Sequence, residues 1–345
     1  MRWRSVLITW IVASVAVVLV WVTTPDGSRV DANGSPAVAR NAPPPIRPGI
    51  DPASVTAVRI SGPGGVVSAE RWDELGPGWL VTRLDAAGKA LWQWPGEDGV
   101  ISGSLRGLAT SELLPSDEAS TDDARYNGAP RLDIVEGDRT TSIVAPGGLS
   151  LGGRGAVRLV QPDGVTVDAL ASSSTRGLVS LPALASWRRA APLFRAGVGP
   201  TRVEAISENP QAVASRSLER RAGRWIDDGA NVEVAREDVE QWLEAVSRLR
   251  ESELIDAPPP AEFETPLTIR LTTSLGADRS LRQSMHVVSA RGDVIAEASV
   301  VVGDEATPIG RVMMRLDAQR LGELVGGVSR IRSVGGGGSD AGSDG

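Results

Sequence analysis

Residues 5–22 form an uncharged and mostly aliphatic run, interrupted by only three hydroxyl side chains. A helix over this run would lack a polar face, which is rare in water-soluble domains. At ~1.5 Å per residue it would span about 27 Å, close to the thickness of a bilayer's hydrocarbon core. We therefore predict that residues 1–22 form a short cytoplasmic stub and an uncleaved transmembrane anchor, with the lipid bilayer as a partner.

The residues flanking this run predict its orientation. Trp3 and Trp21 lie at its two ends, and indole side chains favour the headgroup layers. Arg2 and Arg4 precede the run, and basic flanks favour the cytoplasmic side. We expect a single-pass protein whose N-terminus is cytoplasmic and whose bulk is periplasmic or otherwise extracytoplasmic. A cleaved signal peptide is the competing interpretation, but its apolar region is usually about 7–15 residues and closely followed by a cleavage motif.

Two segments have the composition of unfolded chain. Residues 23–49 are rich in Pro, Gly, Ala, Asn and Ser, which favours an extended spacer without internal hydrogen bonds. Residues 333–345 are dominated by Gly, Ser and Asp and cannot bury an apolar face. We predict a Pro-rich linker in the first segment and a disordered tail in the second.

The chain between these segments contains two weakly similar halves, 50–182 and 183–332. Each half has a strand pattern, a hairpin with a tryptophan strand, an amphipathic helix, and then an alternating strand that begins after a proline. The helix stripe of the second half is the clearer of the two and comprises Val239, Trp242, Leu243, Val246 and Leu249. Candidate closing helices begin near 167–170 and near 316–319, where Asp317 is placed to cap the helix.

Strands that follow one another as hairpins, with few helices, indicate antiparallel sheets covered on one face by helices. The sequence therefore predicts an α+β fold. After the N-terminal transmembrane helix we expect two tandem related units of antiparallel sheet, each covered by one or two helices. Residues 187–189 lie at the junction between the two units.

Composition excludes several kinds of function. The net charge is −7 and the pI is near 5.1, whereas nucleic-acid binding requires a concentrated basic surface. The chain has no cysteine, so it has no disulfide, no thiolate zinc site and no cysteine nucleophile. We predict no nucleic-acid partner.

The residues capable of catalysis or ligand binding lack a surrounding motif. The single histidine, His286, lies in a predicted strand, and the single lysine, Lys89, lies in a predicted hairpin turn. The acidic stretch 117–123 lacks the spacing of a calcium loop. The glycine-rich stretch 147–155 lacks the Gly-Lys-Ser/Thr of a phosphate loop. We predict a non-enzymatic protein with no metal and no cofactor.

Four tryptophans of the first half are the remaining candidates for a ligand or interface site: Trp72, Trp79, Trp92 and Trp94. Exposed indoles stack well on glycans and peptides. The alternative is core packing, which is favoured because the chain has only two phenylalanines and one tyrosine to fill its core.

The residues 49–55, the repeated strand, hairpin and tryptophan pattern, and the junction at 187–189 together resemble the domain of unknown function 4340 family. The resemblance covers roughly residues 50–331 and supplies no catalytic residue. It implies an accessory protein of ABC-type exporters related to gliding-motility transporters, with an ABC permease and ATPase as partners. We therefore expect an envelope scaffold for a transport complex. The alternative is an envelope protein that binds glycan or peptide through the tryptophans.

Overall fold

A computed structural model describes residues 43–73, 78–116, 123–147, 153–194, 199–207, 215–255, 264–276, 279–290, 293–303 and 308–334. The chain divides into Met1–Pro44, of which only residues 43 and 44 are described, and a compact unit Pro45–Gly345. In the described ranges, no helix is both long and apolar enough to cross a membrane. The predicted anchor, with Arg2, Trp3, Arg4 and Trp21, lies outside the described residues, as does most of the predicted linker.

The first nine strands form one series of hydrogen-bonded neighbours. Their bounds are β1 (Ala57–Gly62), β2 (Gly65–Trp72), β3 (Gly78–Leu84), β4 (Ala90–Pro95), β5 (Leu114–Pro115), β6 (Arg131–Glu136), β7 (Arg139–Val144), β8 (Arg154–Val160) and β9 (Thr166–Ser172). Across the sheet the order is β4, β3, β2, β1, β6, β7, β8, β9, β5, and every pairing is antiparallel.

The remaining strands repeat this pairing order. Their bounds are β10 (Arg202–Ile206), β11 (Arg216–Arg221), β12 (Arg224–Asp227), β13 (Val232–Val234), β14 (Glu251–Leu254), β15 (Glu264–Gly276), β16 (Arg279–Ala290), β17 (Asp293–Val302) and β18 (Gly310–Leu316). The order is β13, β12, β11, β10, β15, β16, β17, β18, β14, so each strand occupies the place of the strand nine earlier.

The α+β class with two tandem units of antiparallel sheet, which the sequence predicts, is wrong. The protein is mostly antiparallel sheet, with 48% strand and 21% helix, and it has one large sheet of 18 strands. The two series of strands join where Arg311 of β18 lies opposite Gln93 of β4. This pairing connects residues more than two hundred positions apart, so no local pattern could have predicted it. The domain boundaries at 50–182 and 183–332 stay predictions.

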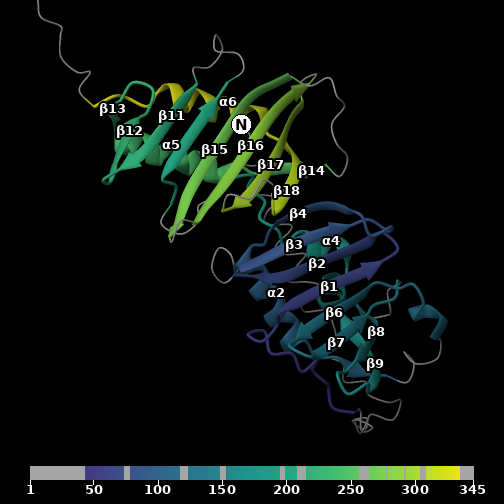
Figure 1. Ribbon diagram of the computed structural model, residues 1–345. Coiled ribbons are helices and arrows are strands. Elements are labelled where there is room, and N and C mark those ends of the chain that lie inside the picture. The colour runs from purple at the N-terminus through teal and green to yellow at the C-terminus, as the bar shows by residue number, and fades with distance from the viewer. Residues whose placement is uncertain are drawn as a thin grey trace, which may run out of the picture. The chain divides into compact units, whose positions relative to one another are not determined.

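The helices lie against one face of the strands. Their bounds are α2 (Asp98–Thr110), α3 (Ser173–Leu178), α4 (Leu181–Ala185), α5 (Arg236–Arg248) and α6 (Ala318–Ser329). In the second series, α5 and α6 contact each other and lie on the same side of the sheet (Figure 1). The predicted stripe of α5 is buried from Val239 to Val246, and the Asp317 carboxylate accepts hydrogen bonds from two N–H groups of α6, as predicted.

The helix predicted near 167–170 is wrong, because this segment is strand β9. Ala169 and Ala171 are buried in the two-residue period of a strand, and Leu170 pairs with Leu114. Ser172 then caps α3, so a short helix begins at Ser173 and not at 167–170, where the sequence predicted it to begin.

The junction between the two series is held by a buried amide. Gln283 of β16 is fully buried, and its Nε2 donates to the Phe194 carbonyl at 2.7 Å while its Oε1 accepts from the Phe194 N–H at 2.8 Å. The Arg188 guanidinium, also buried, forms a close ion pair with Glu251 of β14. The Arg189 N–H donates to the Pro95 carbonyl, at the end of β4, at 2.8 Å. The junction segment is therefore attached to strands of both series.

Short segments outside the strands pair with strand edges. Ile46 exchanges two backbone hydrogen bonds of 2.9 Å with Leu113, next to β5. Ser333 forms a bridge with Val234 of β13, and the neighbouring Arg332 donates to Asp238 through its backbone and its guanidinium. The predicted tail 333–345 thus begins with a residue that pairs with the sheet.

Candidate interaction face

The face of β10, β11 and β15 opposite the helices is polar. Val203 and Ala205 of β10 are buried beneath the helices, so the strand period turns Arg202 and Glu204 to the other face. Register places Glu204 opposite Arg270 of β15 and Arg202 opposite Glu219 of β11. The pairing of three strands therefore brings charged side chains from distant parts of the sequence together.

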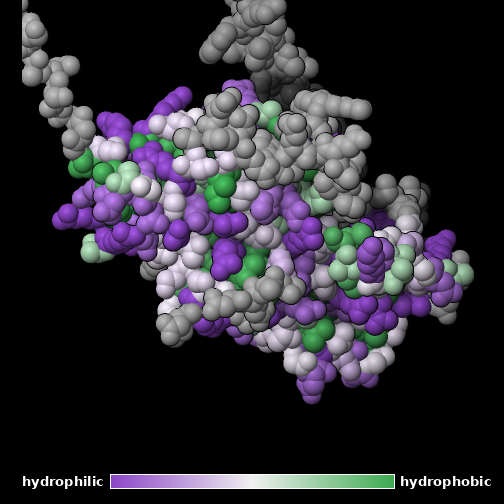
Figure 2. Space-filling model, turned by 45° about the horizontal axis from the view of Figure 1, so that its top comes forward, coloured by the Kyte–Doolittle hydropathy of each residue, from purple (hydrophilic) through white to green (hydrophobic). Residues whose placement is uncertain are grey.

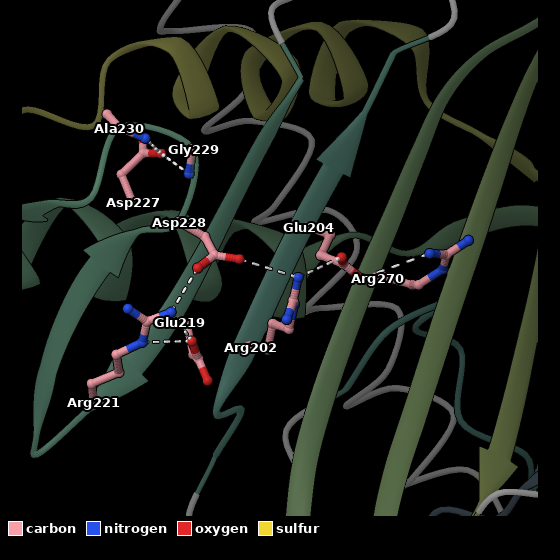
Figure 3. Close-up of polar contacts among 9 residues, drawn as sticks. All are labelled: Arg202, Glu204, Glu219, Arg221, Asp227, Asp228, Gly229, Ala230 and Arg270. Carbon is pink, nitrogen blue, oxygen red and sulfur yellow. Dashed lines mark hydrogen bonds and ion pairs between the residues drawn. The ribbon is translucent and has the colours of Figure 1, made fainter.

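These side chains form a connected series of ion pairs across the strands (Figure 3). Arg270 contacts Glu204 at 3.7 Å, and Glu204 contacts Arg202 at 3.3 Å. Arg202 contacts Asp228 at 3.5 Å, and Arg221 contacts both Asp228 and Glu219 at 2.6 Å. We call this set the charge ladder; its members are Arg202, Glu204, Glu219, Arg221, Asp228 and Arg270.

The charge ladder contributes little to folding stability. Its side chains are between 20% and 48% exposed, and exposed ion pairs stabilise a fold only weakly because water and salt screen them. A hydrogen bond from Arg221 to Glu219, together with the charge of that carboxylate, raises the pKa of Arg221. The ladder is thus a surface on which acidic and basic side chains alternate and which adds little to folding stability.

A more buried ion pair borders the ladder. Arg216 Nε donates to Asp227 Oδ2 at 2.8 Å, while Arg216 Nη1 donates to the Val328 and Ile331 carbonyls at 3.1 and 2.7 Å. Burial works to raise the pKa of Asp227, but the hydrogen bonds from Arg216 and from the Ala230 N–H lower it overall. The Asp227 carboxylate also accepts from the Gly229 N–H, as Figure 3 shows. These bonds fasten the β11–β12 hairpin to the end of α6.

A cavity of about 570 Å³ lies beside this ion pair, within the size range of ligand pockets. Its lining combines Glu204 of the ladder with the exposed Ile206 and with Val328 of α6. Over the visible surface, hydrophilic residues dominate and hydrophobic residues form small separate patches (Figure 2).

The four candidate tryptophans are not together on the surface. Trp79, Trp92 and Trp94 are at most 4% exposed, and Trp72 is half-buried against the same core. The guanidinium of Arg71 lies 4.3 Å from the centroid of the Trp79 ring. At three of the four positions the indole fills the core, so these three offer no exposed face for a glycan or peptide. Their role as ligand or interface residues stays a prediction.

The other sequence candidates also have structural positions. His286 lies on β16, and its Nδ1 is 3.0 Å from the Thr268 hydroxyl on the polar face. Lys89 is exposed and follows the turn between β3 and β4, as predicted. Asp123 begins a 3-10 helix, while the rest of the acidic stretch and residues 148–152 lie outside the described residues. Among described residues, no group of three or more His, Cys, Asp or Glu is arranged to hold a metal ion.

Sequence reasoning missed the charge ladder entirely. Its only sequence signal is the alternation of charged and apolar residues at 202–205, which predicts a half-buried strand but not its neighbours. Glu204 and Arg270 are opposite each other only because β10 pairs with β15.

Comparison with known proteins adds no assignment. No protein-family model, no curated protein and no solved structure matches this chain.

Proposed function

We propose that this chain is a non-enzymatic accessory protein of the cell envelope that serves as a scaffold for an ABC-type transport complex. The polar sheet face carrying the charge ladder contacts a membrane-protein partner, the permease and ATPase assembly. The chain acts by tethering and positioning, and ATP hydrolysis takes place on another chain.

The observation that carries this proposal is the charge ladder itself. Six side chains from four separate segments converge on a face that the helices leave uncovered. Alternating charges at such a face select a partner by complementarity and disfavour wrong partners, while adding little to the stability of the free protein. The resemblance to the domain of unknown function 4340 family supports the choice of an ABC-type partner.

Membrane attachment is the second part of the proposal. The uncharged run 5–22, with Arg2 and Arg4 before it, supports a cytoplasmic N-terminus and an extracytoplasmic location for Pro45–Gly345. Alkaline carbonate extraction of native membranes tests this part. The chain should stay in the pellet, and a chain released into the supernatant would refute the attachment.

The partner is tested by purifying the full-length chain from its native membrane in mild detergent and identifying co-purified proteins by mass spectrometry. A permease and an ATPase should appear in fixed ratio. The variant Arg270→Glu places a second carboxylate beside Glu204 and should reduce their recovery about fivefold, the effect of roughly 1 kcal/mol.

The matched control is Arg248→Glu on α5. Arg248 also pairs with a glutamate, Glu244, but it lies on an exposed helix face away from the ladder. Recovery of the partners should not change in this variant. Isolation of the chain alone, or an equal loss in both variants, would refute the role of the ladder.

A further inference from the structure

A second cavity lies where the two series of strands meet. It has a volume of about 410 Å³ and forms beside the bridge between Gln93 of β4 and Arg311 of β18. Both strands contribute to its walls, as does Ile255, whose N–H donates to the Met313 carbonyl at 3.0 Å. The cavity is therefore built by regular sheet pairing on both sides.

The walls of this cavity are mainly apolar. Leu91 and Trp92 line it from β4, Val312 and Met313 line it from β18, and Ile255 and Pro308 complete it. Such a lining favours burial of a hydrocarbon group, at ~25 cal/mol per Å² of apolar surface removed from water. A ligand for this cavity needs an apolar part.

The charged residues of the described lining are all basic. Lys89 and Arg311 both line the cavity, and its described lining contains no acidic residue. Arg311 forms a close ion pair with Glu297, which lies outside the lining. Lys89 forms no ion pair with any residue that the structure describes, so its ammonium is available to an anion. The cavity thus joins an apolar wall to a cationic rim.

We propose that this cavity binds an anionic amphiphile: an apolar chain that ends in a phosphate or carboxylate group. The apolar chain lies against the half-buried Leu91 and Met313, and the anion is bound by Lys89 with help from Arg311. This site is separate from the charge ladder, and its ligand is independent of the partner proposed above.

Lys89 makes the test specific, because it is the only lysine in the sequence. Full-length protein in phosphatidylcholine nanodiscs is treated with an amine-reactive reagent, and modification of Lys89 is followed by peptide mass spectrometry. Octyl phosphate should slow the modification at least about fivefold, consistent with an ion pair of roughly 1 kcal/mol. Octanol and inorganic phosphate, which each supply half of the required chemistry, should have less than half of this effect.

Two variants test the geometry. Arg311→Gln removes the second cation at a side chain that is 66% exposed, and should weaken the protection of Lys89 by octyl phosphate. Arg106→Gln removes an exposed arginine of α2 outside the cavity lining and should leave the protection unchanged. Near-ultraviolet circular dichroism verifies that both variants keep the native packing.

The source of the amphiphile is tested by changing the nanodisc. If phosphatidylglycerol in the disc protects Lys89 without octyl phosphate, the site takes a membrane lipid. If only added octyl phosphate protects it, the site takes a free amphiphile. The proposal is overturned if neither octyl phosphate nor phosphatidylglycerol slows the modification of Lys89, or if octanol or inorganic phosphate alone slows it as much as octyl phosphate does. It is also overturned if octyl phosphate protects Lys89 in Arg311→Gln as well as in the wild type.

Discussion

The buried amide of Gln283 should be among the most sensitive positions in the protein. Gln283→Leu keeps the size of the side chain but removes both hydrogen bonds to Phe194, leaving one N–H and one carbonyl buried without these partners. An unsatisfied buried polar group costs about 1–3 kcal/mol, so the variant should lose about 2–6 kcal/mol. This is a large share of the ~5–15 kcal/mol that typically separates folded from unfolded protein.

Urea unfolding of the full-length chain, followed by tryptophan fluorescence, measures this loss. The matched control is Gln93→Leu, because Gln93 is half-buried and makes one side-chain hydrogen bond, of 3.1 Å, to the Thr82 hydroxyl. The control should cost about 1 kcal/mol or less. Equal losses in the two variants, or an unchanged midpoint for Gln283→Leu, would refute the idea that this amide fastens the junction to β16. A smaller slope of unfolding free energy against urea concentration in Gln283→Leu would indicate that the two series of strands unfold separately.

Three further predictions concern single side chains. Burial raises the pKa of Tyr126, the only tyrosine in the sequence, above 10.0, so the absorbance of this tyrosine at 295 nm should titrate above pH 10. Because the pKa is higher in the folded protein than in the unfolded chain, the stability that Tyr126 contributes is complete below pH 10 and is lost as pH rises through the folded pKa. Hydrogen bonds from the Arg332 guanidinium and backbone N–H lower the pKa of Asp238 to about 2, so the stability that Asp238 contributes is present above pH 4 and is lost as pH falls toward 2. Arg332→Ala removes the guanidinium but keeps the backbone N–H, so an NMR titration of this variant should show the pKa of Asp238 raised part of the way toward 3.8. Trp242→Phe removes the buried hydrogen bond of 3.0 Å from the indole N–H to the Leu324 carbonyl, whereas the indole N–H of Trp225 has no acceptor in the described structure. Trp242→Phe should therefore lower the free energy of unfolding by about 1 kcal/mol more than Trp225→Phe does, and equal unfolding midpoints for the two variants would contradict this.

Local patterns in the sequence predicted local structure well. The apolar stripe beginning at Val239 is the buried face of α5, and Asp317 caps α6. The turn before Lys89 is also where the pattern placed it. These features depend on residues within a few positions of one another, so periodicity and capping chemistry suffice to find them.

Long-range pairing explains what the sequence could not predict. Residues 167–170 have apolar positions that fit a helix or a strand, and pairing with Leu114 decides for the strand. The single large sheet depends on Arg311 meeting Gln93, and the charge ladder depends on β10 lying beside β15. In each case the deciding contact joins distant segments, and its register is set by the packing of the whole sheet.

The pairing of short segments with strand edges has a consequence for self-association. An unpaired strand edge is a template on which another copy can extend the sheet, which leads to filaments and aggregates. Ile46 occupies backbone groups of Leu113, and Ser333 bridges to Val234, so these parts of the edge are already used within the chain. These two contacts within the chain therefore disfavour extension of the sheet by a second copy at Leu113 and at Val234.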